Sequence, residues 1–402
     1  MITIEVPEAA GAIIRQLNTH GFEAYVVGGC VRDSLLGRVP KDWDITTSAK
    51  PQQVKELFAR TVDTGILHGT VTVLMDHEAY EVTTYRIDGE YEDGRHPNSV
   101  EFTGNLMEDL KRRDFTMNAM AYSDRDGLVD VFGGASDLKS GVIRCVGNPL
   151  DRFHEDALRI LRAIRFSAQL GFQIEEKTKK AIAVIAPNME KVSKERIAVE
   201  LTKLLLSDYP EQMEAVFYSG IAPFVSKSFP KAESGLMNLE RMKSLPKEKH
   251  VRWSGFLRFL DQKDVVLILR ELKLDNDTMD QTKVLTELWK KEIPASKPEI
   301  RMVMSMVKDS LFEDLLIFQS VFLTGSYLDQ LKTVKKLSRE IISDGDCIRL
   351  KDMAVTGRDL IETGIKPGPK MGKILHVLFE DILKNPEHNC RDYLLNYTKE
   401  LI

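Results

Sequence analysis

Two aspartates separated by one residue are the side chains of this sequence best suited to chemistry. Asp42 and Asp44 lie in the segment KDWDIT, where acids alternate with Trp43 and Ile45. In a β-strand alternate side chains point to the same face, so both carboxylates are expected on one face while the apolar residues point into the core. Adjacent acids repel one another unless a cation lies between them, and carboxylate oxygens suit magnesium. The pattern predicts Asp42 and Asp44 as Mg²⁺ ligands; the alternative is a pair of solvated acids at a strand end.

Glu81 is the predicted third acid of this site. It lies within a β-rich run, 80–85, where a lone glutamate is disfavoured. If that strand pairs beside the two aspartates, Glu81 completes the set. Such a trio suits nucleotidyl transfer with two metal ions, which activate an RNA 3′-hydroxyl and neutralise the triphosphate and the departing pyrophosphate. No Walker A or G-x-G-x-x-G loop occurs, which argues against a P-loop NTPase or a dinucleotide enzyme.

A glycine turn ahead of the aspartates offers a place for phosphate. The run 24–27 predicts a strand that leads into Gly28 and Gly29, after which a helix is expected to begin. Glycines let the backbone approach a ligand closely, and the N–H groups of a helix start favour an anion such as a triphosphate. Arg32, in the first helical turn, is placed to reach a phosphate. Alone the motif is weak, because an ordinary strand–turn–helix also uses glycines.

An acid and a base three residues apart, Asp156 and Arg159, are the predicted reader of the nucleotide base. The spacing makes them neighbours on one surface of a helix expected over His154–Leu170. Together they offer one acceptor beside several donors, which matches the Watson–Crick edges of cytosine and adenine but not those of uracil and guanine. The alternative is an intrahelical salt bridge, worth only about 0.3–0.5 kcal/mol on a surface.

Three further arginines are candidate anion contacts. Arg162 and Arg165 continue the spacing of three after Arg159, although each step rotates around the helix, so the three cannot share one narrow face. We expect Arg162 and Arg165 to hold phosphate or to support the start of the helical part. Arg113, in the basic run 111–113, is a candidate for the triphosphate or the base; the alternative is a solvated charge run.

The elements that position these residues change in character near residue 150, where β-rich runs give way to helical periodicity. The expected strands are Ala24–Val27, Trp43–Thr46, Thr70–Met75, Tyr80–Tyr85, Val100–Thr103 and Leu128–Val131, with the third and fourth forming a hairpin. Expected helices follow Gly29 and cover Pro51–Arg60, with Ser48 as its cap, then Glu175–Ala186 and Glu195–Ser207. An irregular connection is expected at 225–250 and a turn at 364–369. These patterns predict an α+β fold: a mixed-sheet head followed by an all-helical body.

Length, charge and cysteine content limit the classes of protein to which this chain could belong. With 402 residues, two or more domains are expected. A net charge of −5 is the wrong sign for a protein coated in RNA, so any polyanion site must be local. No apolar run approaches a membrane helix and no signal-peptide pattern is present, so no membrane association is expected. Four widely spaced cysteines without a C-x-x-C pair are expected to be free thiols in the cytoplasm: Cys30, Cys145, Cys347 and Cys390.

Taken together, the motifs resemble those of the class II tRNA nucleotidyltransferases, the CCA-adding enzymes, and more broadly the bacterial poly(A) polymerase family. GGCVRD, DWD, RRDFTMNA, EDALRILRAIRF and SKERIAVELTKLL occur in the family's order over about the first half of the chain. The resemblance implies a polymerase β-like nucleotidyltransferase head and an elongated all-helical neck, body and tail. It implies Mg²⁺ as cofactor, Asp42 and Asp44 as its ligands, and Glu81 as the third catalytic carboxylate. The implied contacts to CTP and ATP are Gly29, Arg32, Arg113, Asp156, Arg159, Arg162 and Arg165, to which Gly28 of the same turn is added.

The resemblance also divides the chain into functional parts. It implies a catalytic head at 1–145, a base-recognising neck at 146–208, a body at 209–330 and a tRNA-binding tail at 331–402. The implied reaction adds C, C and A to a tRNA 3′ end from CTP and ATP without a nucleic-acid template. In the family a loop matching Arg86–Pro97 accompanies the switch from C to A addition, and its presence favours full CCA addition. A homodimer is compatible with the sequence, which does not decide the oligomeric state.

Three other functions stay open at this point. One is a CC-adding, A-adding or poly(A)-adding enzyme of the same family. Another is a catalytically silent RNA-binding protein, against which a cluster of mutually repelling acids argues. The third is nucleotide transfer to a small molecule or a protein, which leaves the long helical half without a role.

Overall fold

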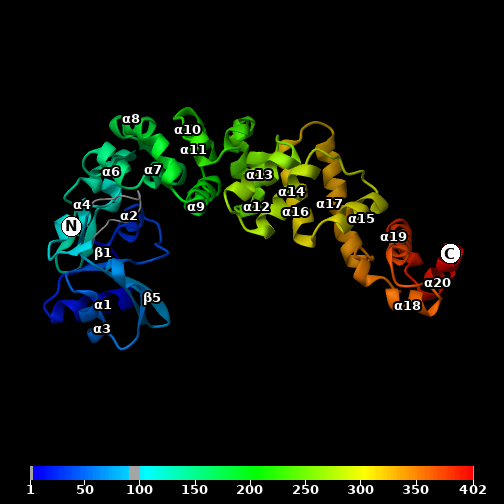
Figure 1. The fold of residues 1–402 in the computed structure, drawn as a ribbon, viewed down its shortest axis with the longest axis horizontal. Helices are drawn as coiled ribbons and strands as arrows, with labels where there is room; N and C mark the ends of the chain where they lie inside the picture. The colour runs from blue at the N-terminus through cyan, green and yellow to red at the C-terminus, as the bar shows by residue number, and fades with distance from the viewer. Residues whose placement is uncertain (1–2, 90–99, 402) are drawn as a thin grey trace. The chain divides into compact units, whose positions relative to one another are not determined.

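The chain forms two compact units in the computed structural model, which describes residues 3–89 and 100–401. One unit comprises Met1–Leu236 with Ile268–Leu274, and the other comprises Met237–Leu267 with Asp275–Ile402. The first unit holds the sheet, and the second is helical (Figure 1). The predicted division into four functional parts, with boundaries after residues 145, 208 and 330, does not coincide with these two units and stays a prediction.

The sheet of the first unit has seven strands in the order β3-β4-β5-β2-β1-β8-β9. It is mixed, because β2 and β5 run parallel whereas the other neighbours are antiparallel. The expected mixed-sheet head is therefore confirmed. The bounds are β1 Ala24–Val27, β2 Ile45–Thr47, β3 Thr61–Gly65, β4 Thr70–Met75, β5 Glu78–Thr84, β8 Ala121–Ser123 and β9 Gly127–Val129.

The predicted hairpin is present, but one predicted strand begins later than expected. β4 and β5 pair over their whole length through a tight turn in which Asp76 and His77 adopt positive φ. β2 begins at Ile45 rather than at Trp43, so Asp42 and Asp44 lie on the segment that enters the strand. The sequence pattern missed β3 and β8, which are short and only partly apolar.

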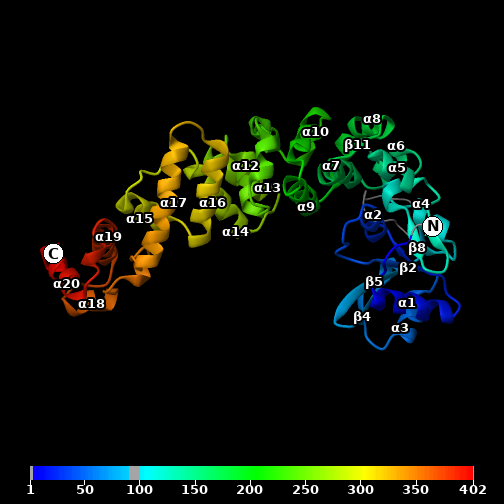
Figure 2. The ribbon, with the colours of Figure 1, turned by 180° about the vertical axis from the view of Figure 1, so that it is seen from behind.

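Short helices cover the sheet. α1 (Glu8–Thr19) and α3 (Pro51–Leu57) contact each other and lie on one side of the sheet in both views (Figure 2). Lys50, not Ser48, is the N-cap of α3, so the predicted cap is wrong: the Ser48 hydroxyl instead accepts a hydrogen bond from the Glu23 N–H. The other helices and the separate ribbon are α2 Gly29–Leu35, α4 Leu106–Lys111, α5 Gly134–Ser140, β6 Arg86–Asp88 and β7 Val100–Phe102. The loop expected at Arg86–Pro97 begins in β6, and its residues 90–97 lie outside the described part of the chain.

Helices follow the sheet, and the first long one differs from its prediction. The helix expected over His154–Leu170 is divided into α6 (Pro149–Glu155) and α7 (Leu158–Leu170), with Asp156 and Ala157 between them. Segment 225–250, expected to be a linker or an irregular connection, contains two 3₁₀ turns, Phe229–Leu236 and Leu239–Ser244, and the boundary between the two units falls between them. The remaining helices before it are α8 Glu176–Ile185, α9 Lys194–Leu205, α10 Met213–Tyr218 and α11 Ala222–Val225, and a short strand pair joins β10 Val142–Ile143 with β11 Gln173–Ile174.

The second unit is built from packed helices alone. Its helices, with α13 shared between the units, are α12 Lys249–Leu257, α13 Gln262–Glu271, α14 Asn276–Leu288, α15 Lys297–Met306, α16 Asp309–Phe322, α17 Tyr327–Asp344, α18 Gly357–Glu362, α19 Pro369–Lys384 and α20 Arg391–Glu400. Leu360, Leu378 and Leu394 join the last three helices in a buried cluster. The predicted turn at 364–369 separates α18 from α19. No helix of the described residues is long and apolar enough to cross a membrane.

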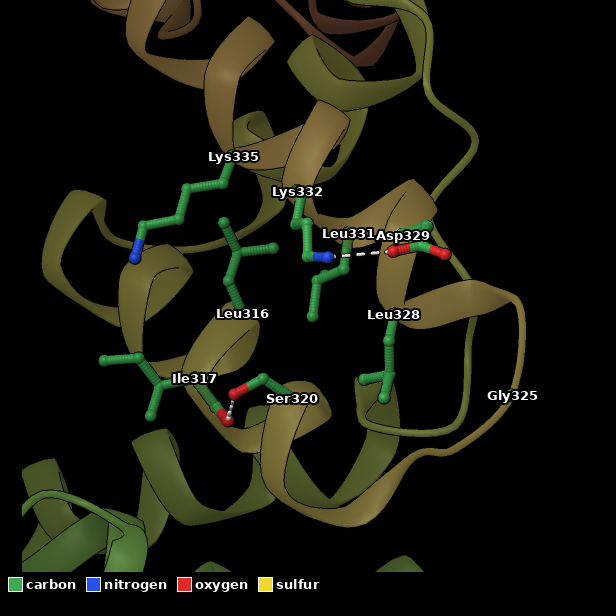
Figure 3. Close-up of a pocket in the computed structure, with 9 residues that line it drawn as sticks. All are labelled: Leu316, Ile317, Ser320, Gly325, Leu328, Asp329, Leu331, Lys332 and Lys335. Carbon is green, nitrogen blue, oxygen red and sulfur yellow. Dashed lines mark hydrogen bonds and ion pairs between the residues drawn. The ribbon is translucent and has the colours of Figure 1, made fainter.

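A groove of about 480 Å³ opens between α16 and α17 of the second unit. Leu316, Leu328 and Leu331 line it, and Lys332 at its edge pairs with Asp329 (Figure 3). Its walls are largely apolar. It lies in a different unit from the predicted catalytic acids.

Thiol reactivity is expected to be confined to one of the four cysteines. Burial raises the pKa of Cys30 to about 11 and that of Cys145 to about 12, and it also raises the pKa of the buried Cys347 thiol. Only Cys390 is exposed, and the thiolate is the reactive form. We expect a chromogenic disulfide reagent at pH 8 to titrate one thiol quickly in the native protein and four after unfolding. Cys390→Ser should abolish the fast phase; a fast phase that survives this change would contradict the assignment.

Candidate functional site

The parallel pairing of β2 with β5 brings two of the predicted acids together. Thr46 on β2 lies opposite Thr83 on β5. Asp44 and Glu81 each precede these threonines by two residues, so extending the register sets Asp44 beside Glu81 on the same face of the sheet. The strand pairing required for Glu81 to act as the third carboxylate is therefore present. Asp42 lies two residues earlier on the entering segment and was wrongly expected within a strand.

The charges around Asp44 act on its carboxyl group directly. Its pKa is raised, first because surrounding atoms reduce its hydration and then because Glu81 and Asp42 add negative charge, whereas Arg113 acts in the opposite direction. Part of the Asp44 side chain stays accessible to solvent. A carboxylate held in this way next to other acids is stabilised by an added cation.

The acids fit a metal ion only as a partial set of ligands. Within the described residues, no three His, Cys, Asp or Glu side chains are close enough together to hold a metal by themselves. Magnesium is commonly bound by one or two carboxylates together with substrate phosphates and water. The acidic edge formed by Asp42, Asp44 and Glu81 has the oxygen chemistry for that arrangement, in which the nucleotide supplies the remaining ligands.

The glycine turn and Arg113 meet beside the acids. Gly28 has φ +80°, and a Cβ at this position would lie 3.0 Å from Nη1 of Arg113, so the missing side chain makes room for the guanidinium. Arg113 also reaches Asp109, whose Oδ2 lies 3.4 Å from Nη2. The Nε–H of Arg113 is buried without an acceptor. Arg113 is therefore held near Asp44 with hydrogen-bonding capacity left over.

Arg32 is anchored on three sides. Its Nε and Nη2 atoms donate to the two carboxylate oxygens of Asp33 at 2.9 and 3.0 Å, and Nη1 donates to Oδ1 of Asn118 at 2.8 Å. The guanidinium also lies over the ring of Phe166, 5.0 Å from its centroid. Gly29 lies beside it, because a Cβ there would be 3.8 Å from Arg32 Nη2.

Asp156 occupies the break between α6 and α7 rather than a helical position. Its Oδ1 accepts from the N–H of Leu158 at 3.0 Å, and its Oδ2 accepts from Nη2 of Arg196 at 2.6 Å. Asp156 and Arg159 therefore do not share one continuous helix, which corrects the geometric basis of the predicted pair. The two residues still lie on the same turn at the start of α7, since the Arg159 N–H donates to the Asp156 carbonyl at 3.0 Å.

Arg159 forms hydrogen bonds with α6 and with the residue that ends α4. It donates to Oε2 of Glu155 at 2.5 Å and to the carbonyl oxygens of Arg152 and Arg112, each at 3.0 Å. Because Arg112 belongs to the turn that ends α4, this contact joins the sheet-bearing part to α7. Arg159 is thus held close to the RRDFT segment.

Arg162 and Arg165 face different partners. Arg162 donates to Oδ2 of Asp114 from Nε at 2.7 Å and lies 2.6 Å from it through Nη2. Burial would raise the pKa of Asp114, but the charge of Arg162 and a hydrogen bond from Asn118 together hold it well below its usual range. Arg165 is 6% exposed and donates to Oε2 of Glu200 at 2.6 Å.

Replacing Arg165 with Ala is expected to destabilise the first unit by about 3–5 kcal/mol, because it leaves Glu200 charged and buried without its partner. Glu200 is 4% exposed, and desolvation lowers the pKa of Arg165 itself. The free energy of unfolding should be measured by denaturant titration with a probe in this unit. Arg125→Ala, which removes an exposed partner of Asp126, is the matched control and should unfold like the parent. Equal stability of the two variants would show that the Arg165 pair is not structural.

The comparisons with known proteins cover nearly the whole chain. Residues 24–144 match the poly A polymerase head domain, 171–229 match the probable RNA and SrmB-binding site of polymerase A, and 245–398 match the putative domain 2 of tRNA nucleotidyltransferase. The CCA-adding enzyme of Enterococcus faecalis is 37% identical over 98% of this chain and 96% of its own, and that of Leuconostoc citreum is 38% identical with the same coverage. The chain belongs to the CCA-adding enzyme family.

Solved structures of the CCA-adding enzyme family agree with the fold. The crystal structure of the Bacillus stearothermophilus CCA-adding enzyme in complex with CTP matches with a TM-score of 0.84 at 31% identity, over 98% of this chain and 96% of that one. The Thermotoga maritima enzyme complexed with tRNA matches with a TM-score of 0.62 at 22% identity and supports the fold alone. As a member of the CCA-adding enzyme family the chain is a nucleotidyltransferase, and the family depends on divalent metal ions.

Two residues of the site had no assigned role in the sequence analysis. Arg196, the partner of Asp156, lies in the stretch SKERIAVELTKLL, and Asn118, the partner of Arg32, lies in RRDFTMNA. Both stretches were recognised as motifs. Their individual roles were not deduced, because the partners are 40 and 86 residues away along the chain.

Proposed function

We propose that the chain adds C, C and A to the 3′ end of tRNA from CTP and ATP, without a nucleic-acid template and with Mg²⁺ as its metal. The observation that carries the proposal is the position of Asp44 beside Glu81 on one face of the sheet, close enough for Glu81 to raise the pKa of Asp44. Similarity to CCA-adding enzymes along almost the entire chain supports the same substrates.

In this proposal Asp42 and Asp44 hold the metal, and Glu81 adds negative charge to its surroundings. Divalent cations, when bound, lower the pKa of the RNA 3′-hydroxyl and neutralise the departing pyrophosphate. Arg113 and Arg32 orient the triphosphate, since both are fixed by side-chain contacts beside the glycine turn. Gly28 makes room for the Arg113 guanidinium, and Gly29 leaves space for a close approach of the phosphates.

Base selection is assigned to Asp156 with Arg159. A carboxylate accepts from the amino group of cytosine or adenine, while a guanidinium donates to the adjacent ring nitrogen; uracil and guanine present the reverse order. Arg196 holds the Asp156 carboxylate in place through a 2.6 Å ion pair. Arg162 and Arg165, both paired with acids, support the start of the helical part rather than touch the base.

The four predicted parts then have separate tasks. Residues 1–145 perform the chemistry and residues 146–208 inspect the base, while 209–330 form the helical body and 331–402 bind the tRNA. The match of 171–229 to a probable RNA-binding site of polymerase A supports RNA contacts outside the head.

The proposal is tested with three tRNAs that lack the last one, two or three nucleotides. Each is incubated with one labelled nucleotide at a time and with Mg²⁺. We expect CMP on the two shorter substrates and AMP on the longest. Incorporation of CMP alone, of AMP alone or of a long A tract would identify a partial-adding enzyme or a poly(A) polymerase instead, and an absence of incorporation and of pyrophosphate release would favour the silent RNA-binding protein.

A further inference from the structure

A buried chain of hydrogen bonds connects Arg32 on α2 with Arg162 on α7. Arg32 Nη1 donates to Oδ1 of Asn118 at 2.8 Å, and Nδ2 of Asn118 donates to Oδ1 of Asp114 at 3.0 Å. The other oxygen of Asp114 accepts from Arg162 Nε at 2.7 Å. The chain thus leads from the glycine turn to the helix that begins at the base-reading residues.

Only a carboxamide satisfies both neighbours of residue 118. The oxygen of Asn118 accepts from a cation, while its nitrogen donates to an anion, and no other small side chain offers both functions on one planar group. Asn118 and Asp114 are 6% and 7% exposed. Burial makes each link costly to lose, because water cannot replace a missing partner there.

Phe166 provides a second connection between the same two arginines. The guanidinium carbons of Arg32 and Arg162 lie 5.0 and 5.5 Å from the centroid of its ring. Phe166 also packs edge-on against Phe115, with centroids 5.8 Å apart. A displacement of α7 therefore acts on Arg32 through the ring and through the Asn118 amide together.

We propose that Asn118 is a positioning residue that aligns Arg32 with the triphosphate in response to the base held at the start of α7. The inference rests on the proposed function. A base that fits Asp156 and Arg159 leaves α7 in the position where Arg162, Asp114 and Asn118 direct Arg32. A base that does not fit shifts α7 and misdirects Arg32, so a wrong nucleotide is bound but transferred slowly.

The test is a comparison of kcat and Kd for CTP and UTP on a tRNA that lacks its last three nucleotides. Asn118→Ala is expected to lower kcat with CTP by about 10- to 100-fold, the loss typical of a buried hydrogen bond to a charged group. The Kd of CTP, measured by its stabilisation of the protein against heat, should change less than about threefold. The ratio of kcat for CTP to kcat for UTP should fall about tenfold, because α7 no longer acts on Arg32.

Two further variants separate positioning from folding. Thr116→Val removes a buried hydrogen bond to Asp137 from the same 3₁₀ turn, off the path, and should leave the kcat ratio unchanged. Asn118→Asp keeps an acceptor for Arg32 but sets a second carboxylate against Asp114, so it should reduce the ratio even if Asn118→Ala does not fold. A ratio equal to that of the parent in the folded Asn118 variants overturns the inference. Failure of the parent protein to incorporate CMP sinks the proposed function instead, so the two failures are distinguishable.

Discussion

Replacing Asp44 with Asn is expected to reduce nucleotide incorporation at least about a thousandfold, because loss of a charge that holds a catalytic cation costs several kcal/mol in the transition state. The change is isosteric and removes a carboxylate that Glu81 and Asp42 repel. Initial rates of CMP incorporation at saturating CTP and Mg²⁺ measure the effect. Asp63→Asn, at an exposed aspartate of the same unit that pairs with Lys55, is the matched control and should retain parent activity.

Although Asp44→Asn should lower the activity, it should maintain or raise the stability of the folded protein. The pKa of Asp44 is raised in the folded protein, so its ionisation destabilises the fold once the pH exceeds the pKa of the unfolded chain. At neutral pH Asp44→Asn should therefore be as stable as the parent or more stable, and the difference should vanish in acid, where both forms are neutral. An Asp44→Asn variant that is less stable than the parent at neutral pH would contradict this prediction.

Replacing Asp156 with Ala is expected to relax base selection more than it slows transfer. A well-placed pair of hydrogen bonds to a base contributes about 1–3 kcal/mol of discrimination, so rejection of UTP relative to CTP should fall by about 10- to 100-fold. Incorporation of CMP should decline by a smaller factor. Competition between labelled CTP and UTP on one tRNA measures the ratio directly.

Asp156 also accepts from the Leu158 N–H, so a second variant is needed to separate base reading from helix capping. Asp156→Asn retains an acceptor for that N–H but loses the negative charge opposite Arg196. Asp156→Asn should lose discrimination between CTP and UTP, but it should be more stable than Asp156→Ala. Asp151→Ala, at an exposed acid in the first turn of α6, is the control. Unchanged rejection of UTP in both Asp156 variants would remove the base-reading role.

Several parts of the fold could be predicted because their patterns are local. The strand before Gly28, the hairpin of β4 and β5 and the helical second half each follow from periodicity and turn residues within a short window. The errors also have local causes. Because acids alternate with apolar residues, β2 was predicted to begin at Trp43 instead of Ile45. Continuous helical periodicity concealed the break at Asp156, whose carboxylate accepts hydrogen bonds from the Leu158 N–H and from Arg196.

The sequence by itself determined the chemical inventory: clustered acids, a glycine turn, arginines near both, and a motif order that indicates the family. The tertiary structure decided which of these groups meet. It set Glu81 beside Asp44 through a parallel strand pair, joined Asp156 to Arg196, and buried Arg165 against Glu200. Such partners are far apart along the chain, and which of them pair depends on the packing of all intervening elements, a property that no short stretch of sequence carries.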